Sequence, residues 1–377
     1  MYSSTCILQL NFQLLTQISY PFIIAFICSI VIIPVIIKLV EKFHLFDKPD
    51  QRKEHTDPIP TLGGIAIFIG AALSMFLWQP SFPMAALYVM TAIVLIFLMG
   101  IADDMKDLNA SLKLLIELSM AAMIAYGGIR ITSLHGLFGI HDLPIVLQYV
   151  FTIVAIAGVT NAFNLIDGID GLAGGLSLIS LVTAGALLLI SGDDFFALLA
   201  FAMAGGVAGF LLFNYYPAKI FMGDTGSLVI GFVLAVLAIR FMQVNIQPVG
   251  EINNIPVIAF SLVLIPVFDT IRVFVFRLIN GKSAFSPDKT HIHHLLTNAG
   301  YNHGLVARLI CFSHSLVLLQ VILFSRLEQE LVLLTSLTLV TLITLAFKTV
   351  GERRIQNLGK SFKYSLAKIR LPQKENS

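Results

Sequence analysis

The chain carries a succession of apolar stretches, and this feature limits the folds open to it. A helix that spans a bilayer needs about 20 mostly apolar residues. Stretches of about this length lie at residues 20–40, 62–78, 83–101, 112–128, 144–163, 170–190, 195–213, 226–243, 255–277, 304–325 and 329–348. The sequence therefore predicts an all-α fold, a polytopic transmembrane helical bundle with about eleven spans.

The composition excludes several other classes of protein. Of 377 residues, 57% are hydrophobic and 12% are charged, against about 25% charged in an ordinary soluble domain. Such an apolar chain is neither a soluble globular protein nor disordered. With 24 Lys and Arg against 22 Asp and Glu, its net charge indicates no nucleic-acid partner. The cysteines are far apart and indicate neither a disulfide framework nor a thiolate metal site.

Two local features concern the spans themselves. No Lys or Arg precedes the first apolar stretch, so it lacks the basic start of a cleaved signal peptide and is expected to be a retained span. Gly205, Gly206 and Gly209 give the seventh stretch a face of small residues. Such a face favours close helix packing in lipid.

The basic residues predict the orientation. With the N-terminus outside, the inner connections and the tail hold 21 of the 24 Lys and Arg, and only Arg130, Arg240 and Arg326 lie outside. Because cytoplasmic loops carry the excess of Lys and Arg, we expect an N-out/C-in topology. Residues 1–350 would form the membrane domain and residues 351–377 a basic cytoplasmic tail, which is either a surface helix or a solvated end.

Acidic residues gather where predicted spans end on the inner side. The first group is Asp103-Asp104-x-x-Asp107, in which crowded carboxylates raise one another's pKa unless a cation relieves them. A solvated helix end is the alternative interpretation. Because acidic residues beside a span are costly and are usually retained for a task, we favour a functional role.

Two further acidic motifs face the same side. In Asn164-x-x-Asp167-Gly168-x-Asp170, the three polar side chains form one stripe if the segment is helical, and such oxygen ligands suit a hard cation. In Gly223-Asp224-x-Gly226-Ser227, the carboxylate lies at a helix start, where amides bind phosphate. Asp224 either binds Mg²⁺ or caps the helix.

Two basic motifs complete the set. Arg52-Lys53-x-His55 precedes Gly63-Gly64, and the long ninth connection carries His291-x-His293-His294. Three histidines suit zinc, but a clamp for a diphosphate explains them better beside a carboxylate-held Mg²⁺. Asp269 and Arg272 are expected to form a structural ion pair. The combined chemistry favours transfer of a phosphorylated group from a soluble nucleotide to a lipid phosphate.

These five motifs, in this order, resemble the polyprenyl-phosphate N-acetylhexosaminyl-1-phosphate transferases, relatives of the phospho-MurNAc-pentapeptide translocase. The resemblance covers roughly residues 35–300 and includes Asn161 and Asn214. It implies that undecaprenyl phosphate attacks the β-phosphorus of a UDP-N-acetylhexosamine, with GlcNAc as the favoured sugar, at the cytoplasmic face of a bacterial inner membrane. Mg²⁺ is the implied cofactor, with Mn²⁺ as a substitute, and a homodimer is an open alternative for assembly.

The resemblance also implies roles for individual residues. Asp103 would be the base toward the lipid phosphate, assisted by Asp104, and Asp224 would be the main Mg²⁺ ligand, with Asp104 as a second. Three residues would position the diphosphate and the metal: Asn164, Asp167 and Asp170. Asn214 would contact the nucleotide. Phosphate or sugar would be bound by Lys53, His55, His291, His293 and His294. Asp167 is also counted among the catalytic carboxylates.

Two alternatives stay open at this point. The run His291-Ile292-His293-His294 differs from the His-His-His run of the muramyl-peptide translocases, so a phospho-MurNAc-pentapeptide transferase is the second candidate. An ion-coupled transporter is the candidate from another class, because intramembrane carboxylates and interrupted helices also mark carriers. The acids at helix ends, rather than at the bilayer midplane, favour the transferase. A direct attack and a phospho-enzyme route are both compatible with the motifs.

Overall fold

The computed structural model describes residues 4–43, 59–78, 83–244, 254–281 and 290–369, with side chains within 19–357. The helices are α1 (Ser4–Phe43), α2 (Gly63–Trp78), α3 (Met84–Lys106), α4 (Ala110–Tyr126), α5 (Ile145–Ile166), α6 (Leu172–Ile190), α7 (Asp194–Asn214), α8 (Gly223–Gln243), α9 (Ile255–Ser261), α10 (Leu264–Ile279), α11 (His294–Thr297), α12 (His303–Leu323) and α13 (Gln329–Ile369), with one 3-10 turn, η1 (Leu137–Gly139). In these residues the only β contact is an isolated bridge between Ser133 and Asp142. The predicted all-α bundle is confirmed.

Each predicted apolar stretch coincides with helix. Eight helices in the described part of the chain are long and apolar enough to cross a membrane, and the α9–α10 pair, bent by 76°, forms a ninth such segment. The other two are shorter: α2 has 16 residues and α4 has 17. Eleven helical segments therefore match the prediction, while eleven complete spans stay a prediction.

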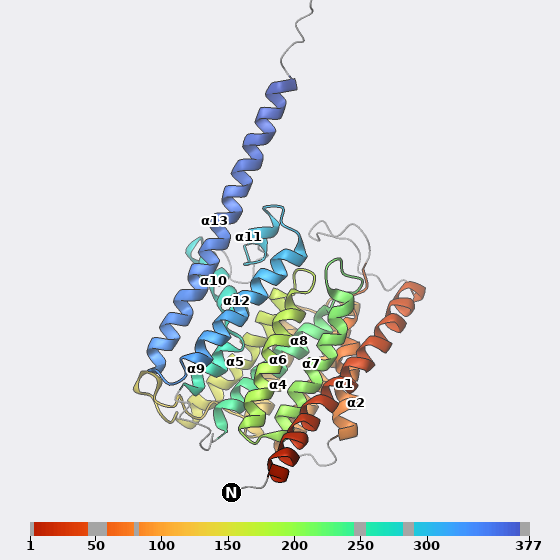
Figure 1. The fold of residues 1–377 in the computed structure, drawn as a ribbon, viewed down its shortest axis with the longest axis vertical. Coiled ribbons are helices and arrows are strands. Elements are labelled where there is room, and N and C mark those ends of the chain that lie inside the picture. The colour runs from red at the N-terminus through yellow and green to blue at the C-terminus, as the bar shows by residue number, and fades with distance from the viewer. Residues whose placement is uncertain (1–3, 44–58, 79–82, 245–253, 282–289, 370–377) are drawn as a thin grey trace, which may run out of the picture.

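The bundle is built around α7 and α8, whose side chains are almost all buried. Helices α1, α2 and α6 pack against α7, and α3, α5 and α2 pack against α8 (Figure 1). The small-residue face of α7 makes this packing close. A Cβ on Gly205 would lie 2.1 Å from the carbonyl oxygen of Phe22, and one on Gly209 would lie 2.7 Å from that of Phe26. The predicted close-packing role of these glycines is confirmed.

The break between α9 and α10 is held by polar side chains. Ser180 donates a hydrogen bond to the carbonyl oxygen of Leu262 at 2.6 Å and lies 2.9 Å from Nε2 of the buried His314. A freed carbonyl at this depth needs such a partner because no water replaces the lost helical bond. Helix α10 therefore runs at 76° to α9. It packs against α5 and brings Asp269 to the histidine segment.

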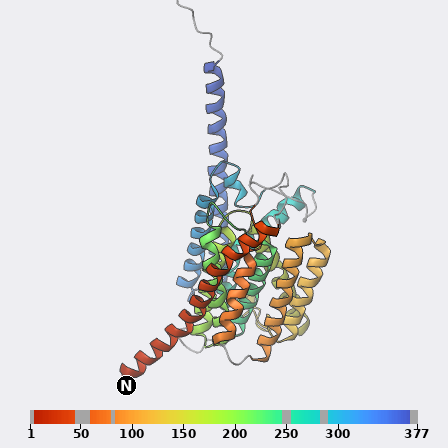
Figure 2. The same ribbon diagram turned by 90° about the vertical axis from the view of Figure 1, so that its right-hand side faces the viewer.

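Helix α13 is unbroken across residue 350, where the sequence predicted the end of the membrane domain. Its 41 residues span about 61 Å at 1.5 Å per residue, and its C-terminal half projects away from the bundle (Figures 1 and 2). The described part of the basic tail is therefore helical.

Candidate active site

The site lies at one end of the bundle, where α3, α5, α7 and α10 end and α8 begins. The start of α8 is fixed by Asp104. Its carboxylate accepts hydrogen bonds from the amides of Asp224 and Thr225, at 2.8 and 3.0 Å, and from the hydroxyl of Thr225 at 2.6 Å. A carboxylate at a helix N-terminus satisfies amides that lack helical partners. Asp104, rather than Asp224, is thus the helix cap, and it holds the backbone of Asp224 in place.

Glycines let the surrounding backbone close on this helix start. Gly223 has a φ of +71°, a conformation that glycine adopts without steric cost, and a Cβ there would lie 2.0 Å from the carbonyl oxygen of Thr61. The amides of Gly63 and Gly64 donate to the carbonyls of Phe221 and Met222, at 3.0 and 2.9 Å. The Gly63-Gly64 motif therefore holds the backbone just before α8 in place.

Asp103, Lys113 and Asp224 form the charged centre of the site. Asp103 is 5% exposed and pairs with the ammonium of Lys113. The same ammonium lies 3.2 Å from Oδ2 of Asp224, whose Oδ1 accepts a hydrogen bond from Nδ2 of Asn164 at 2.9 Å. Four helices, α3, α4, α5 and α8, supply these side chains. One cation between two carboxylates reduces the repulsion that would otherwise separate them.

Sequence reasoning missed Lys113 and Glu117. Glu117 is 2% exposed and accepts a hydrogen bond from Nδ2 of Asn161, which also donates to the carbonyl of Ala157 at 2.9 Å. It lies one helical turn after Lys113, on the same face of α4. The available signal was the position of both charges at or within a predicted span, where ionisable residues are rare and functional.

The segment 167–171 departs from the expected helical stripe. Helix α5 ends at Ile166, and Gly171 has a φ of +74°. Asp167 and Asp170 therefore follow the helix in a loop instead of sharing a face with Asn164. Burial raises the pKa of Asp167 to about 7, and the negative charges of Asp224, Asp104 and Asp170 add to the increase.

Asp170 and Asn214 tie the loops of the site together. Asp170, 1% exposed, accepts the amide hydrogen of Ala218 at 3.0 Å and contacts Nδ1 of His303 at 3.2 Å. Asn214 accepts from the amide of Gly171 at 2.9 Å and donates to the carbonyl of Ile220 at 2.9 Å. In the structure both side chains position loops; the ligand contacts predicted for them stay predictions.

The histidine segment is anchored by Asp269. This carboxylate, 1% exposed, lies 2.8 Å from Nδ1 of His291 and accepts the amide hydrogen of Ile292 at 3.0 Å. Arg272 donates to Asp269 at 2.7 Å and to the carbonyl of Thr290 at 2.6 Å. The predicted ion pair is confirmed, and it has a further task, because it fixes the backbone and the first ring of the segment.

The histidine segment meets the loop after α5. A Cβ on Gly168 would lie 2.5 Å from Nε2 of His293, so only glycine admits the ring beside Asp167. The rings of His293 and His294 are 4.2 Å apart, and those of His291 and His293 are 6.0 Å apart. Burial lowers the pKa of His293 to about 3. This ring is therefore neutral at pH 7, so it can offer a ligand hydrogen bonds but no charge.

The predicted residues thus fall into two groups. Asp103, Asp104, Asn164 and Asp224 are in direct contact or share a partner. The others lie in the loops beside them or at a helix end: Asp167, Asp170, His291 and His293 in loops, Asn214 at the end of α7 and His294 at the start of α11. Lys53 and His55 lie outside the described residues. The contacts bring several of the expected residues together, and their shared role in one site stays a prediction.

The donor set of the site fits a magnesium ion. The carboxylates of Asp103 and Asp224, which share the ammonium of Lys113, are hard ligands, and Mg²⁺ usually takes one or two carboxylates together with phosphate oxygens and water. In the described residues, three or more His, Cys, Asp or Glu side chains do not meet in a metal-binding arrangement.

Comparison with known proteins identifies the family. Residues 86–242 match glycosyl transferase family 4. The chain is 34% identical to a probable undecaprenyl-phosphate N-acetylglucosaminyl 1-phosphate transferase of Bacillus subtilis (strain 168), over 80% of this chain and 84% of the relative. It is also similar to the undecaprenyl-phosphate alpha-N-acetylglucosaminyl 1-phosphate transferases of Yersinia pestis, at 34% identity over 89% and 91% of the two chains, and of Escherichia coli (strain K12), at 32% over 74% and 76%. The chain therefore belongs to glycosyl transferase family 4, in one family with these 1-phosphate transferases.

Proposed function

We propose that the protein transfers GlcNAc-1-phosphate from UDP-GlcNAc to undecaprenyl phosphate. An oxygen of the lipid phosphate bonds to the β-phosphorus, the bond from that phosphorus to the bridging oxygen breaks, and UMP leaves with the electron pair. The observation that carries the proposal is the arrangement of Asp103, Lys113 and Asp224 at the helix ends of an apolar bundle. The names of the relatives favour GlcNAc over the phospho-MurNAc-pentapeptide. The product would start a cell-envelope polysaccharide.

The residues of the site divide the work. Asp103 orients or deprotonates the lipid phosphate, and Asp167, with its raised pKa, holds a proton near the diphosphate. His291, His293 and His294 donate hydrogen bonds to the diphosphate or sugar, and Asp104 keeps the α8 amides in place. Lys53 and His55 are proposed phosphate contacts, and Asn214 is proposed to contact the nucleotide. Asn164 and Asp170 are proposed to position the diphosphate and the metal.

Asp224 would hold Mg²⁺. Asp104, the second ligand expected from the sequence, uses both carboxylate oxygens to cap α8, so its part is to hold the backbone of Asp224. When bound, the ion offsets the repulsion between two phosphates and stabilises charge on the leaving group. Mn²⁺, which also accepts carboxylate and water ligands, is the proposed substitute.

We further propose that this end of the bundle faces the cytoplasm of a bacterial inner membrane. The basic residues near the site support this orientation through the positive-inside rule, and a cytoplasmic site meets both a soluble nucleotide and a lipid. The position of the carboxylates at helix ends argues against an ion-coupled transporter, whose sites lie near the bilayer midplane.

A donor panel tests the proposal. The purified full chain is incubated with undecaprenyl phosphate, Mg²⁺ and either UDP-GlcNAc, UDP-GalNAc, UDP-glucose or UDP-MurNAc-pentapeptide, and UMP and the lipid product are measured. We expect UMP release with UDP-GlcNAc, loss of it without the lipid or with EDTA, and recovery on adding Mg²⁺ or Mn²⁺. Turnover with UDP-MurNAc-pentapeptide alone would establish the second candidate, and no UMP with any donor would refute a transferase.

Replacing Asp269 by Asn should weaken donor binding without touching the substrates directly. The change removes the charge that anchors His291 and Arg272, and a hydrogen bond to a charged group is worth about 1.5–3 kcal/mol. We expect KM for the UDP-sugar to rise roughly ten- to a hundredfold, with a smaller change in KM for the lipid.

The matched control is Asp193→Asn, which breaks the ion pair with Arg240 at the opposite end of α7 and α8, where the two groups are 2.5 Å apart. This variant should lose stability in thermal unfolding but keep the KM for the donor. Equal donor KM values for the two variants would show that Asp269 does not position the histidine segment.

A further inference from the structure

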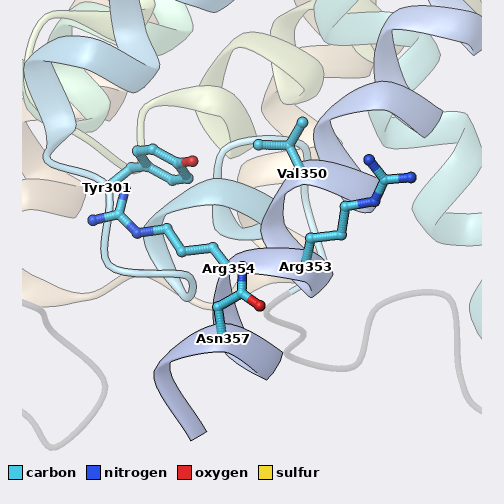
Figure 3. A pocket seen from close by; sticks show the side chains of 5 residues that line it. All are labelled: Tyr301, Val350, Arg353, Arg354 and Asn357. Carbon is cyan, nitrogen blue, oxygen red and sulfur yellow. The ribbon is translucent and has the colours of Figure 1, made fainter. Parts of the chain in front are cut away.

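A pocket that carries two arginines lies between the loop after α11 and the distal part of α13. Tyr301, Val350, Arg353, Arg354 and Asn357 line it, and its volume is about 440 Å³ (Figure 3). None of these side chains is acidic. Among the described residues, no carboxylate forms an ion pair with either arginine. The pocket therefore presents positive charge without an internal counter-charge.

Contacts within the protein orient the guanidinium of Arg354 before any ligand binds. Its guanidinium carbon lies 3.8 Å from the centre of the Tyr301 ring, and its Nη2 donates to the carbonyl of Gly300 at 3.3 Å. Figure 3 shows this guanidinium over the tyrosine, while Arg353 extends to another side of the opening. Stacking on Tyr301 fixes the plane of the Arg354 guanidinium. The carbonyl of Gly300 accepts from only one of the five N–H donors of this group. The remaining N–H groups are available to an anion.

The hydropathy of α13 predicts that the pocket lies at the depth of lipid phosphates. The apolar part of α13 ends at Phe347, and Lys348 is the first charge after it. Arg353 follows Phe347 by six residues, or about 9 Å along a helix, and the polar layer of a bilayer begins at the edge of a hydrocarbon core about 30 Å thick. Val350, 46% exposed, lies between Phe347 and Arg353 along the helix and contributes an apolar side chain to the pocket.

The wall formed by α13 is packed firmly against the bundle. A Cβ on Gly351 would lie 2.3 Å from the carbonyl oxygen of Leu295, so the helix lies directly on the backbone of α11. Tyr301 follows α11 and its amide donates to the carbonyl of Leu296 at 3.3 Å. Both walls are therefore held in place before any ligand arrives.

We propose that this pocket binds the phosphate group of an anionic membrane lipid. Arginine forks bind phosphate oxygens through paired, charge-assisted hydrogen bonds, and Val350 lies toward the apolar part of α13. The membrane depth favours a lipid over a soluble phosphate. The site is separate from the acidic centre, and the proposal does not depend on which reaction that centre performs.

Lipid binding by the full chain tests this proposal. The detergent-solubilised protein is titrated with phosphatidylglycerol or phosphatidylcholine, and bound lipid is counted by native mass spectrometry. We expect one phosphatidylglycerol to bind more tightly than phosphatidylcholine, and Arg353→Gln/Arg354→Gln to weaken that binding at least about tenfold. Arg353→Gln alone leaves the contacts of Arg354 with Tyr301 and Gly300 intact and should give an intermediate loss, which covers the case of a misfolded double variant.

Lys38→Gln/Lys42→Gln is the matched control. It removes the same charge from exposed positions near the C-terminal end of α1, which lies across the bundle from α13 (Figure 1), and it should bind phosphatidylglycerol like the parent. Equal weakening in both double variants would overturn the proposal in favour of general surface charge. Binding of phosphatidylglycerol no tighter than that of phosphatidylcholine would overturn an anionic lipid as the ligand.

Discussion

Replacing Asp224 by Asn is expected to lower turnover on the order of a thousandfold, the cost of removing a major electrostatic contribution from a preorganised site. The amide keeps the shape of the side chain but loses the charge that faces Lys113 and would hold Mg²⁺. Release of UMP at saturating substrates measures the loss. A titration with Mg²⁺ shows whether more of the ion restores any activity.

The control for this variant is Asp194→Asn, which changes an exposed carboxylate in the first turn of α7, at the opposite end of the bundle. It should turn over like the parent. The assignment of Asp224 fails if Asp224→Asn releases UMP at the parental rate with the parental Mg²⁺ dependence while both proteins unfold at the same temperature.

Replacing Lys113 by Gln is expected to lower turnover about a hundredfold and to tighten Mg²⁺ binding at the same time. Without the ammonium, Asp103 and Asp224 lose their common partner, so substrate phosphates meet uncompensated negative charge. The same excess of negative charge attracts a divalent cation more strongly. The Mg²⁺ concentration for half-maximal activity should therefore fall several-fold, which a merely unfolded site would not produce.

Lys106→Gln provides the comparison, because Lys106 is exposed in the last turn of α3, near the same carboxylates in the chain. Its loss should leave the turnover and the Mg²⁺ concentration for half-maximal activity near the parental values. If Lys113→Gln behaves like Lys106→Gln, the bridging ammonium has no part in the reaction.

Much of the fold could be predicted because the bilayer imposes it. Apolar stretches of about 20 residues must become helices, since every backbone polar group needs an internal partner in lipid, and each predicted stretch is helical in the structure. The 76° bend between α9 and α10 was predictable only in part. Pro266 has no N–H, so it leaves the carbonyl of Leu262 without its helical partner. The hydroxyl of Ser180, which satisfies this carbonyl and contacts His314, lies far from Leu262 in the chain and meets it only in the folded bundle.

The candidate site was predicted less completely. Asp103, Asn164 and Asp224 were recognisable as polar residues at helix ends on one side. The helical stripe from Asn164 to Asp170 was wrong because α5 stops at Ile166. A spacing of three residues indicates a shared face only while the helix continues, and a periodic pattern does not locate the residue at which it ends.

By itself, the sequence determined that this chain is a helical membrane protein with polar chemistry at one end, because hydropathy and charge act locally and through the membrane. Only the tertiary structure decided which groups share a task. It made Asp104 the cap of α8 and gave Asp103 and Asp224 one ammonium, and it made Asp269 the anchor of His291. Each of these contacts joins different helices or the segments beside them, and the distance between two such groups is set by packing rather than by their separation in the chain.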